Sequence, residues 1–174
     1  MNSCPSTFSF GTHRLGALVL FALLTALAAR HAHAAVLTCT VSATPVAFGT
    51  YSPLQPAPLT GTGTIMTVCT VNSHSNTITV DLSAGTSASF TTRTMTTSVG
   101  ATTYPLNYNL YLNAADTQIW GDGTGGSLVD TVTLTRHGNN NTITTNLTVY
   151  GAVAPAQDPA PGTYSDGIIV TVNF

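Results

Sequence analysis

The stretch TYSDGIIVTVNF (Thr163–Phe174) decides the fold class, because apolar residues alternate in it with small and polar ones. A period of two is typical of a β-strand with one buried face. Such a strand on an open sheet edge would be an aggregation hazard, so it needs a partner strand. The residues predicted to share its apolar face are Ile168, Val170, Val172 and Phe174.

Seven segments upstream show the same alternation, and Gly, Pro, Asn and Ser clusters separate them. No segment after residue 34 has the apolar periodicity of a helix. Short strands with turn signals between them favour an all-β chain folded as a β-sandwich. The seven segments are residues 37–42, 60–71, 76–85, 89–97, 104–112, 127–136 and 144–151.

The N-terminal region has the pattern of a secretory signal peptide. A short basic start precedes an apolar run from Leu15 to Ala29, and the small-x-small site Ala32-His33-Ala34 follows. A membrane anchor is the alternative, but this run is short for a spanning helix. We therefore expect residues 1–34 to be a signal peptide and residues 35–174 to form one exported domain.

The composition excludes some classes of partner. The chain has no Lys or Glu, and its charged residues make up 6% against a typical ~25%. After residue 34 there are two Arg and six Asp, a net charge of 2 − 6 = −4. Two arginines cannot form a basic footprint, so no nucleic acid partner is expected. Threonine is abundant, and its branched side chain and hydroxyl suit strands with one solvent-exposed face. This composition favours an extracellular structural protein.

The cysteines predict one disulfide bond. Cys4 falls in the expected signal peptide, which leaves Cys39 and Cys69 as a pair in an oxidising compartment. A bridge between them would stabilise the fold by roughly 3–4 kcal/mol on the chain-entropy model. The segment Phe48–Tyr51 lies inside this covalent loop, and we expect it to pack over the bridge.

The sequence offers few groups for catalysis. His74 and His137 each lie in a polar stretch that reads as an exposed turn, and no nucleophile, phosphate-loop or zinc motif is present. The stretch WGDGTGG (Trp120–Gly126) has a single carboxylate, Asp122, whereas a calcium loop needs several oxygen ligands. It reads as a tight turn in which Trp120 covers the edge of the core. We expect no enzymatic activity, cofactor, metal or small-molecule substrate.

Six stretches together resemble a known family. FGTYSP, VDLSAGTSASFTTRTM, LNYNLYL, IWGDGTGGS, VYGAVAPAQ and PGTYSDGIIVTVNF occur in the order and spacing typical of the spore coat protein U domain. Subunits of archaic chaperone–usher pili are similar to it, and the resemblance covers Cys39 to Phe174. It implies an immunoglobulin-like β-sandwich that lacks its last strand. A periplasmic chaperone lends that strand during secretion, and a neighbouring subunit's N-terminal extension later replaces it.

The resemblance also implies partners and a site. The partners are the chaperone, an outer-membrane usher and other pilus or coat subunits, and the destination is the periplasm and then the cell surface. Only Ala35–Thr38 precede Cys39 after the expected cleavage, about 13 Å when extended. The implied subunit can therefore accept a strand but has no obvious segment to donate, which leaves its role open between a tip, an end-cap and a coat component outside a fibre. The residues implied to border the acceptor groove are Ile168, Val170, Val172 and Phe174, with Phe174 the chaperone's anchor point.

Two other hypotheses about the function are compatible with the sequence. A self-contained secreted sandwich could bind a surface or carbohydrate through the loops Ser52–Gly61 and Gly151–Thr163, and it would be a stable monomer with a closed sheet. An enzyme would need His74 or His137 to meet an aspartate in a pocket.

Overall fold

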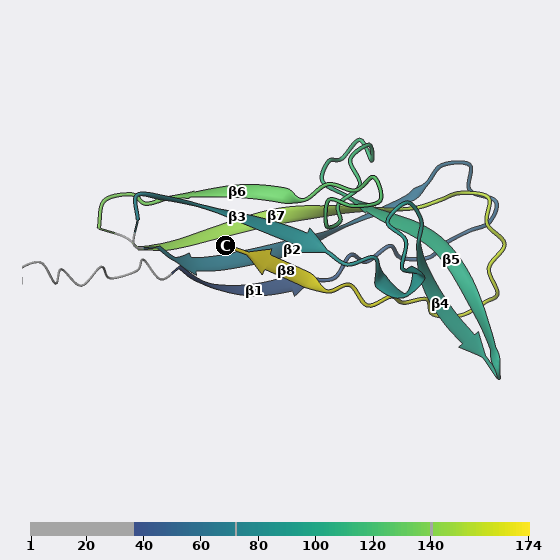
Figure 1. Cartoon of the computed structure of the whole chain (residues 1–174). Coiled ribbons are helices and arrows are strands. Elements are labelled where there is room, and N and C mark those ends of the chain that lie inside the picture. Colours follow the sequence, from purple (N-terminus) through teal and green to yellow (C-terminus); the bar gives the residue numbers. More distant parts are fainter. Residues whose placement is uncertain (1–36, 72, 140) are drawn as a thin grey trace, which may run out of the picture. The chain divides into compact units, whose positions relative to one another are not determined.

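The computed structural model describes residues 37–174 apart from 72 and 140, so the predicted signal peptide lies outside the described residues. The fold is all-β, as predicted, and each of the eight alternating segments contains a strand (Figure 1). This part of the chain contains no helix with the length and apolarity needed to cross a membrane. The elements are β1 (Thr38–Thr44), β2 (Leu59–Thr70), β3 (Ser75–Leu82), the 3₁₀ turn η1 (Gly85–Ser87), β4 (Arg93–Val99), β5 (Thr102–Tyr111), β6 (Asp130–Thr135), β7 (Thr142–Val153) and β8 (Val170–Asn173).

The strands form the two sheets of an immunoglobulin-like β-sandwich. The larger sheet has the order β1-β2-β7-β5-β4, and the smaller sheet has the order β6-β3-β8. All pairings within the sheets are antiparallel. Among the described strands, β8 pairs only with β3, so it forms an edge of the smaller sheet. Figure 1 shows β8 beside β1, an edge strand of the larger sheet, and the two strands are in contact.

The inward faces of the strands make one hydrophobic core, as the alternation predicts. On β2 the face that carries Ile65, Thr67 and Cys69 is buried, and Val71 just beyond the strand continues it. Trp120 is fully buried in this core rather than at its edge, and its indole Nε1 donates a hydrogen bond to the carbonyl of Val80. The core residues are Ile65, Cys69, Val71, Ile78, Val80, Leu82, Met95, Leu106, Tyr108, Leu110, Trp120, Leu134, Val149 and Val153.

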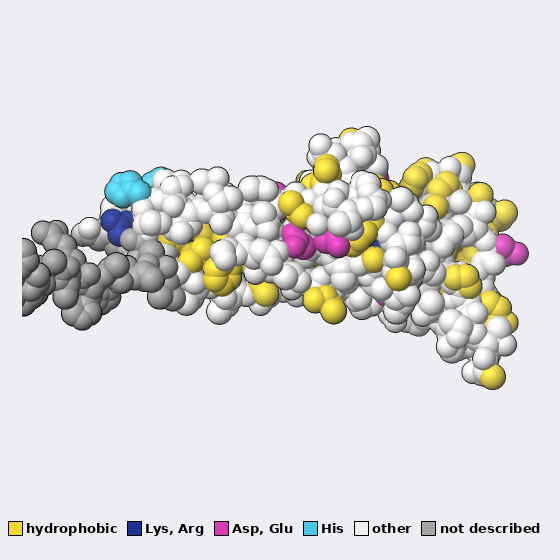
Figure 2. Space-filling view, viewed as in Figure 1, with side chains coloured by type: hydrophobic (Ala, Val, Ile, Leu, Met, Phe, Trp, Pro, Cys, Tyr) yellow, Lys and Arg dark blue, Asp and Glu magenta, His cyan; other side chains and the backbone are white. Residues whose placement is uncertain are grey.

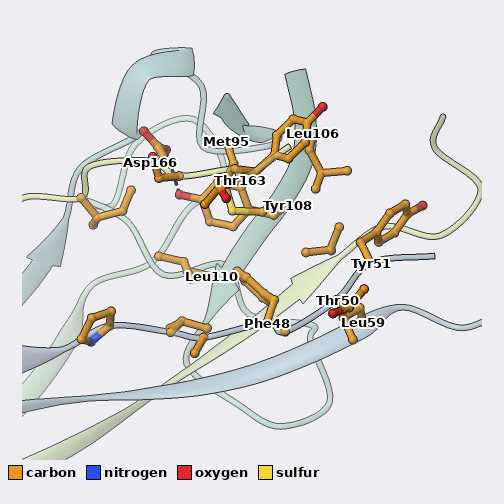
Figure 3. Close-up of a pocket in the computed structure, with 18 of the residues that line it drawn as sticks. Phe48, Thr50, Tyr51, Leu59, Met95, Leu106, Tyr108, Leu110, Thr163 and Asp166 are labelled. Carbon is orange, nitrogen blue, oxygen red and sulfur yellow. Dashed lines mark hydrogen bonds between the residues drawn. The ribbon is translucent and has the colours of Figure 1, made fainter. Parts of the chain in front are cut away.

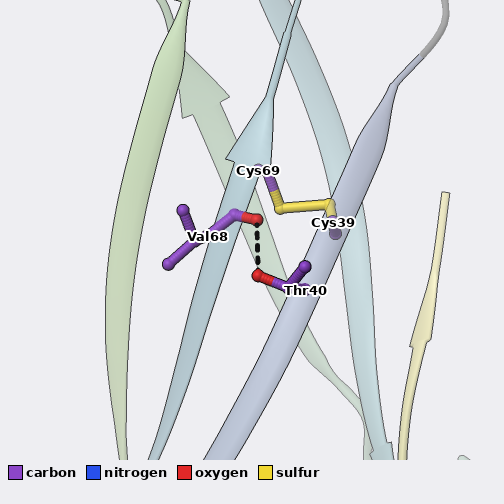
Figure 4. The surroundings of a disulfide bond; sticks show 4 residues. All are labelled: Cys39, Thr40, Val68 and Cys69. Atoms are coloured by element: carbon purple, nitrogen blue, oxygen red, sulfur yellow. Dashed lines mark hydrogen bonds between the residues drawn. A yellow bond between two sulfur atoms is a disulfide. The ribbon is translucent and has the colours of Figure 1, made fainter.

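The predicted disulfide is present and joins β1 to β2. Cys39 and Cys69 are directly opposite in the antiparallel register, with their Cα atoms 4.1 Å apart (Figure 4). Beside the bridge, the Thr40 hydroxyl donates to the carbonyl of Val68 at 3.5 Å. The bridge therefore fixes the edge strand β1, which otherwise has a neighbour on one side only.

The expectation that Phe48 packs over this bridge is wrong. The chain continues beyond β1 and crosses β2 and β7 where glycines replace side chains. A Cβ atom on Gly61 would lie 2.7 Å from the Ala47 carbonyl oxygen, and one on Gly151 would lie 2.8 Å from the Phe48 ring. Because Gly61 lies eight residues before Cys69 on β2, Phe48 is about 26 Å from the bridge along the strand.

Candidate strand-acceptor groove

A groove of about 1000 Å³ opens the core between the two sheets. We call residues 43–51 its first wall and residues 159–170 its second wall. Figure 3 shows the side chains of both walls around a floor supplied by several strands. The apolar core therefore reaches the surface along one side of the sandwich. The floor consists of Ile65, Leu82, Met95, Leu106, Tyr108, Leu110, Val149 and Val153.

The first wall is held by packing on glycines and by aromatic contact. Val46 and Phe48 lie over Gly61, Gly63 and Gly151, where any side chain would prevent this close approach. The Phe48 ring then meets the Tyr108 ring edge-on, with centroids 5.9 Å apart and an interplanar angle of 70°. An edge-to-face pair of this kind adds a specific geometry to the apolar contact.

Polar contacts of Asp166 hold the second wall. Its carboxylate accepts a hydrogen bond from the Tyr108 hydroxyl at 2.8 Å (Figure 3). It also accepts from the backbone N–H and the hydroxyl of Thr86 in η1, each at 3.0 Å. Gly85 makes room for it, because a Cβ atom there would lie 2.0 Å from the carboxylate. One step earlier, Ser165 forms an antiparallel bridge with Thr96 at the edge of β4.

The start of β8 is held through Ser83 by a buried arginine. Ser83 and Ile169 exchange two hydrogen bonds, one from the Ser83 backbone N–H to the Ile169 carbonyl and one from the Ile169 N–H to the Ser83 hydroxyl. The Ser83 carbonyl accepts from two nitrogens of Arg93, at 3.1 and 2.9 Å. Arg93 is fully buried and also donates to the carbonyl of Trp120 and to the side chain of Asn109, each at 2.7 Å.

Burial shifts the ionisation of the two polar groups under the groove. Desolvation lowers the pKa of Arg93, and the nearby Tyr108 and Asp166 oppose this shift. Desolvation, followed by the hydrogen bond to Asp166 and its charge, raises the pKa of Tyr108 well above its usual range. Tyr108 is therefore a neutral hydroxyl that donates to a carboxylate at physiological pH.

The predicted interface residues lie in three different environments. Ile168 and Val170 line the groove. Val172 is partly buried against the core. Phe174 is 65% exposed, and Figure 2 shows hydrophobic side chains gathered where β8 ends. The structure contains no partner chain, so a contact of these residues with a chaperone or subunit stays a prediction.

The other candidate residues lie at exposed positions. His74 and His137 are both exposed, and the Arg136 N–H donates to the His74 carbonyl at 3.0 Å, so the two histidines lie at the same end of the sandwich (Figure 2). The Asp122 carboxylate accepts from the N–H and hydroxyl of Thr124 within its own turn, and these bonds lower its pKa. In the described part of the chain, no group of three or more His, Cys, Asp or Glu could hold a metal ion.

Sequence reasoning missed the polar residues that position the groove. The available signal was the alternation in RTM, which places Arg93 on the same face as the buried Met95. When alternation places an arginine on an inward face, there are two explanations. Either the register assigned to the strand is wrong, or the arginine is buried and donates hydrogen bonds to backbone carbonyls. The contact between Tyr108 and Asp166 spans 58 residues and had no local signal.

Residues 23–171 match the Spore Coat Protein U domain. The chain belongs to this family. It is also similar to a chain in the crystal structure of the CsuC–CsuE chaperone–tip adhesion subunit pre-assembly complex, from archaic chaperone–usher Csu pili of Acinetobacter baumannii. The TM-score is 0.51 and the sequence identity is 26%, over 80% of this chain and 40% of the solved chain. This chain thus spans less than half of the solved chain that it matches. No curated protein matches the sequence.

The sequence stretches that carry the family resemblance meet at the groove. FGTYSP supplies Phe48, LNYNLYL supplies Tyr108, and PGTYSD supplies Asp166. Two further stretches, VDLSAGTSASFTTRTM and IWGDGTGGS, meet through the hydrogen bond from Arg93 to the Trp120 carbonyl. Five of the six stretches, all except IWGDGTGGS, therefore contribute residues to the lining of the groove.

Proposed function

We propose that this protein is a non-enzymatic subunit of a surface pilus or coat, and that its groove accepts a β-strand from another chain. The observation that carries the proposal is an apolar groove that opens the core beside the edge strand β8. An incoming strand would pair with the free edge of β8 and insert alternate side chains between the two walls. Its apolar residues would complete the sandwich.

The fit is favourable in chemistry. The groove lining contains one carboxylate, that of Asp166, and no lysine, arginine or histidine, so it suits apolar side chains. Burying three or four such side chains would contribute roughly 5–12 kcal/mol before the cost of ordering the strand. Ile168–Phe174 extends over about 23 Å, so a strand of roughly seven residues or more would cover it.

The similarity to a chain of a chaperone–subunit complex supports a periplasmic chaperone as one source of the strand and another subunit as the later source. On this proposal the protein is exported to the periplasm and then reaches the cell surface, with an outer-membrane usher on the route. Ile168, Val170 and Val172 would border the incoming strand, and Phe174 would meet the chaperone.

Thermal unfolding of the exported protein, with its disulfide intact, tests the proposal. The probe is a synthetic peptide of about nine residues in which valine and threonine alternate, and the control peptide has the same composition in two blocks. At a concentration of 100 times the Kd, the alternating peptide should stabilise the fold by about 2.7 kcal/mol, a rise in Tm of roughly 10 °C. A sharp transition that neither peptide moves would instead indicate a complete, self-contained sandwich.

A further inference from the structure

One floor residue contacts both walls of the groove. Tyr108 lies on β5 between Leu106 and Leu110, which are its neighbours on the inward face of that strand. Its ring packs edge-on against Phe48 of the first wall, and its hydroxyl bonds to Asp166 of the second wall (Figure 3). The two walls belong to segments more than a hundred residues apart in the sequence.

We propose that Tyr108 is the positioning residue of the groove, which sets the separation of its two walls for an incoming strand. The inference rests on the proposed function and adds to it a specific residue. Tyr108 is only 6% exposed, so its ring cannot move without displacing the core. Because this rigid ring contacts both Phe48 and Asp166, it fixes the distance between the two walls.

The hydroxyl is the part of Tyr108 that can be removed without disturbing the packing. Asp166 also accepts from the Thr86 and Gly167 backbone N–H groups, at 3.0 and 2.9 Å. The second wall thus stays attached to η1 through Asp166 and to β4 through the Ser165–Thr96 bridge when the Tyr108 bond is lost, but it loses its hydrogen bond to β5. The substitution Tyr108→Phe should loosen the wall and leave the fold intact.

The test compares the affinity of the alternating valine–threonine peptide for three proteins. Tyr108→Phe should weaken binding by about tenfold, the loss of one hydrogen bond to a charged acceptor. The control Tyr150→Phe removes a hydroxyl from β7, outside the groove lining, and should leave the Kd within about twofold. A role confined to stability would lower the Tm of empty and occupied protein equally and leave the Kd unchanged. An unchanged or tighter Kd in Tyr108→Phe overturns the inference.

A second measurement needs no peptide. In the empty protein, amide exchange at Thr86 and Gly167 reports whether Asp166 keeps its place. These amides should exchange several-fold faster in Tyr108→Phe and at the wild-type rate in Tyr150→Phe. Failure of the wild-type protein to bind the peptide would contradict the proposed function, whereas unchanged exchange at both amides in Tyr108→Phe would contradict the positioning role.

The pair can also be tested through its partner. Asp166→Asn weakens the same hydrogen bond, so its effect on the Kd and that of Tyr108→Phe should not add in the double variant. Additive effects would mean that the two residues act on binding independently, which would contradict a role of their shared hydrogen bond.

Discussion

Replacing Arg93 by lysine tests whether a buried arginine holds the sandwich together beneath the groove. The guanidinium serves three acceptors that lie in different directions, the carbonyls of Ser83 and Trp120 and the side chain of Asn109. It also lies over the Phe90 ring, with 5.4 Å from Cζ to the centroid. Lysine keeps the charge but offers its donors from a single nitrogen on a flexible stem.

The expected loss follows from the acceptors left without a donor. One lysine ammonium cannot reach both the Ser83 and Trp120 carbonyls on one side and the Asn109 oxygen on the other. At least one or two buried acceptors would lose their partner, at about 1–3 kcal/mol each. We therefore expect Arg93→Lys to lower the free energy of unfolding by roughly 2–5 kcal/mol. This is a large part of the 5–15 kcal/mol typical of a domain.

Urea denaturation with the disulfide intact measures this loss. The matched control is Arg136→Lys, because Arg136 lies near the end of β6 and donates one long side-chain bond, at 3.3 Å, to Asn141. The control should stay within about 0.5 kcal/mol of the wild type. If Arg93→Lys is as stable as Arg136→Lys, the account of Arg93 as a buried organiser of these strands is wrong.

Three further outcomes are expected. Reducing the Cys39–Cys69 bridge should lower the free energy of unfolding by about 3–4 kcal/mol, because the bridge closes a 30-residue loop, and calorimetry with and without reductant measures this. Gly151→Ala should cost about 1–3 kcal/mol in urea denaturation, since its Cβ would lie 2.8 Å from the aromatic ring above it, whereas Gly167→Ala meets open space and should be nearly neutral. Because the folded state raises the pKa of Tyr108, its contribution is fully present below about pH 10 and is lost above it, by up to about 1.4 kcal/mol per pH unit. Tyr108→Phe should make this alkaline fall in stability less steep.

Much of the fold could be predicted from the sequence, because alternation reports directly on which strand face is buried. The faces of Ile65 and Cys69, of Ile78 and Val80, and of Leu110 are buried as the alternation predicts. The disulfide was predictable from the number of cysteines, since Cys39 and Cys69 are the pair that remains after the expected signal peptide. These are local signals, and the structure preserves them.

The site depended on contacts that local patterns do not encode. Phe48 was expected near the disulfide because the two share a covalent loop, yet the chain after β1 continues along the glycines of β2 and takes Phe48 far from the bridge. The sequence placed Arg93 in a predicted strand but gave it no role, because arginine side chains are usually exposed. In the structure its hydrogen bonds to distant segments override that preference. The contact of Tyr108 with Asp166 likewise depends on how two distant segments meet.

Amide hydrogen exchange along β8 tests the central claim most directly, namely that its outer edge awaits a strand from another chain. In the protein alone, those amides of Val170–Asn173 that point away from β3 should exchange rapidly, while those that point toward β3 are protected. Adding the alternating valine–threonine peptide or a chaperone should protect the outward amides as well. Protection of all four amides in the protein alone would show that the sheet already has a partner, which would contradict the account.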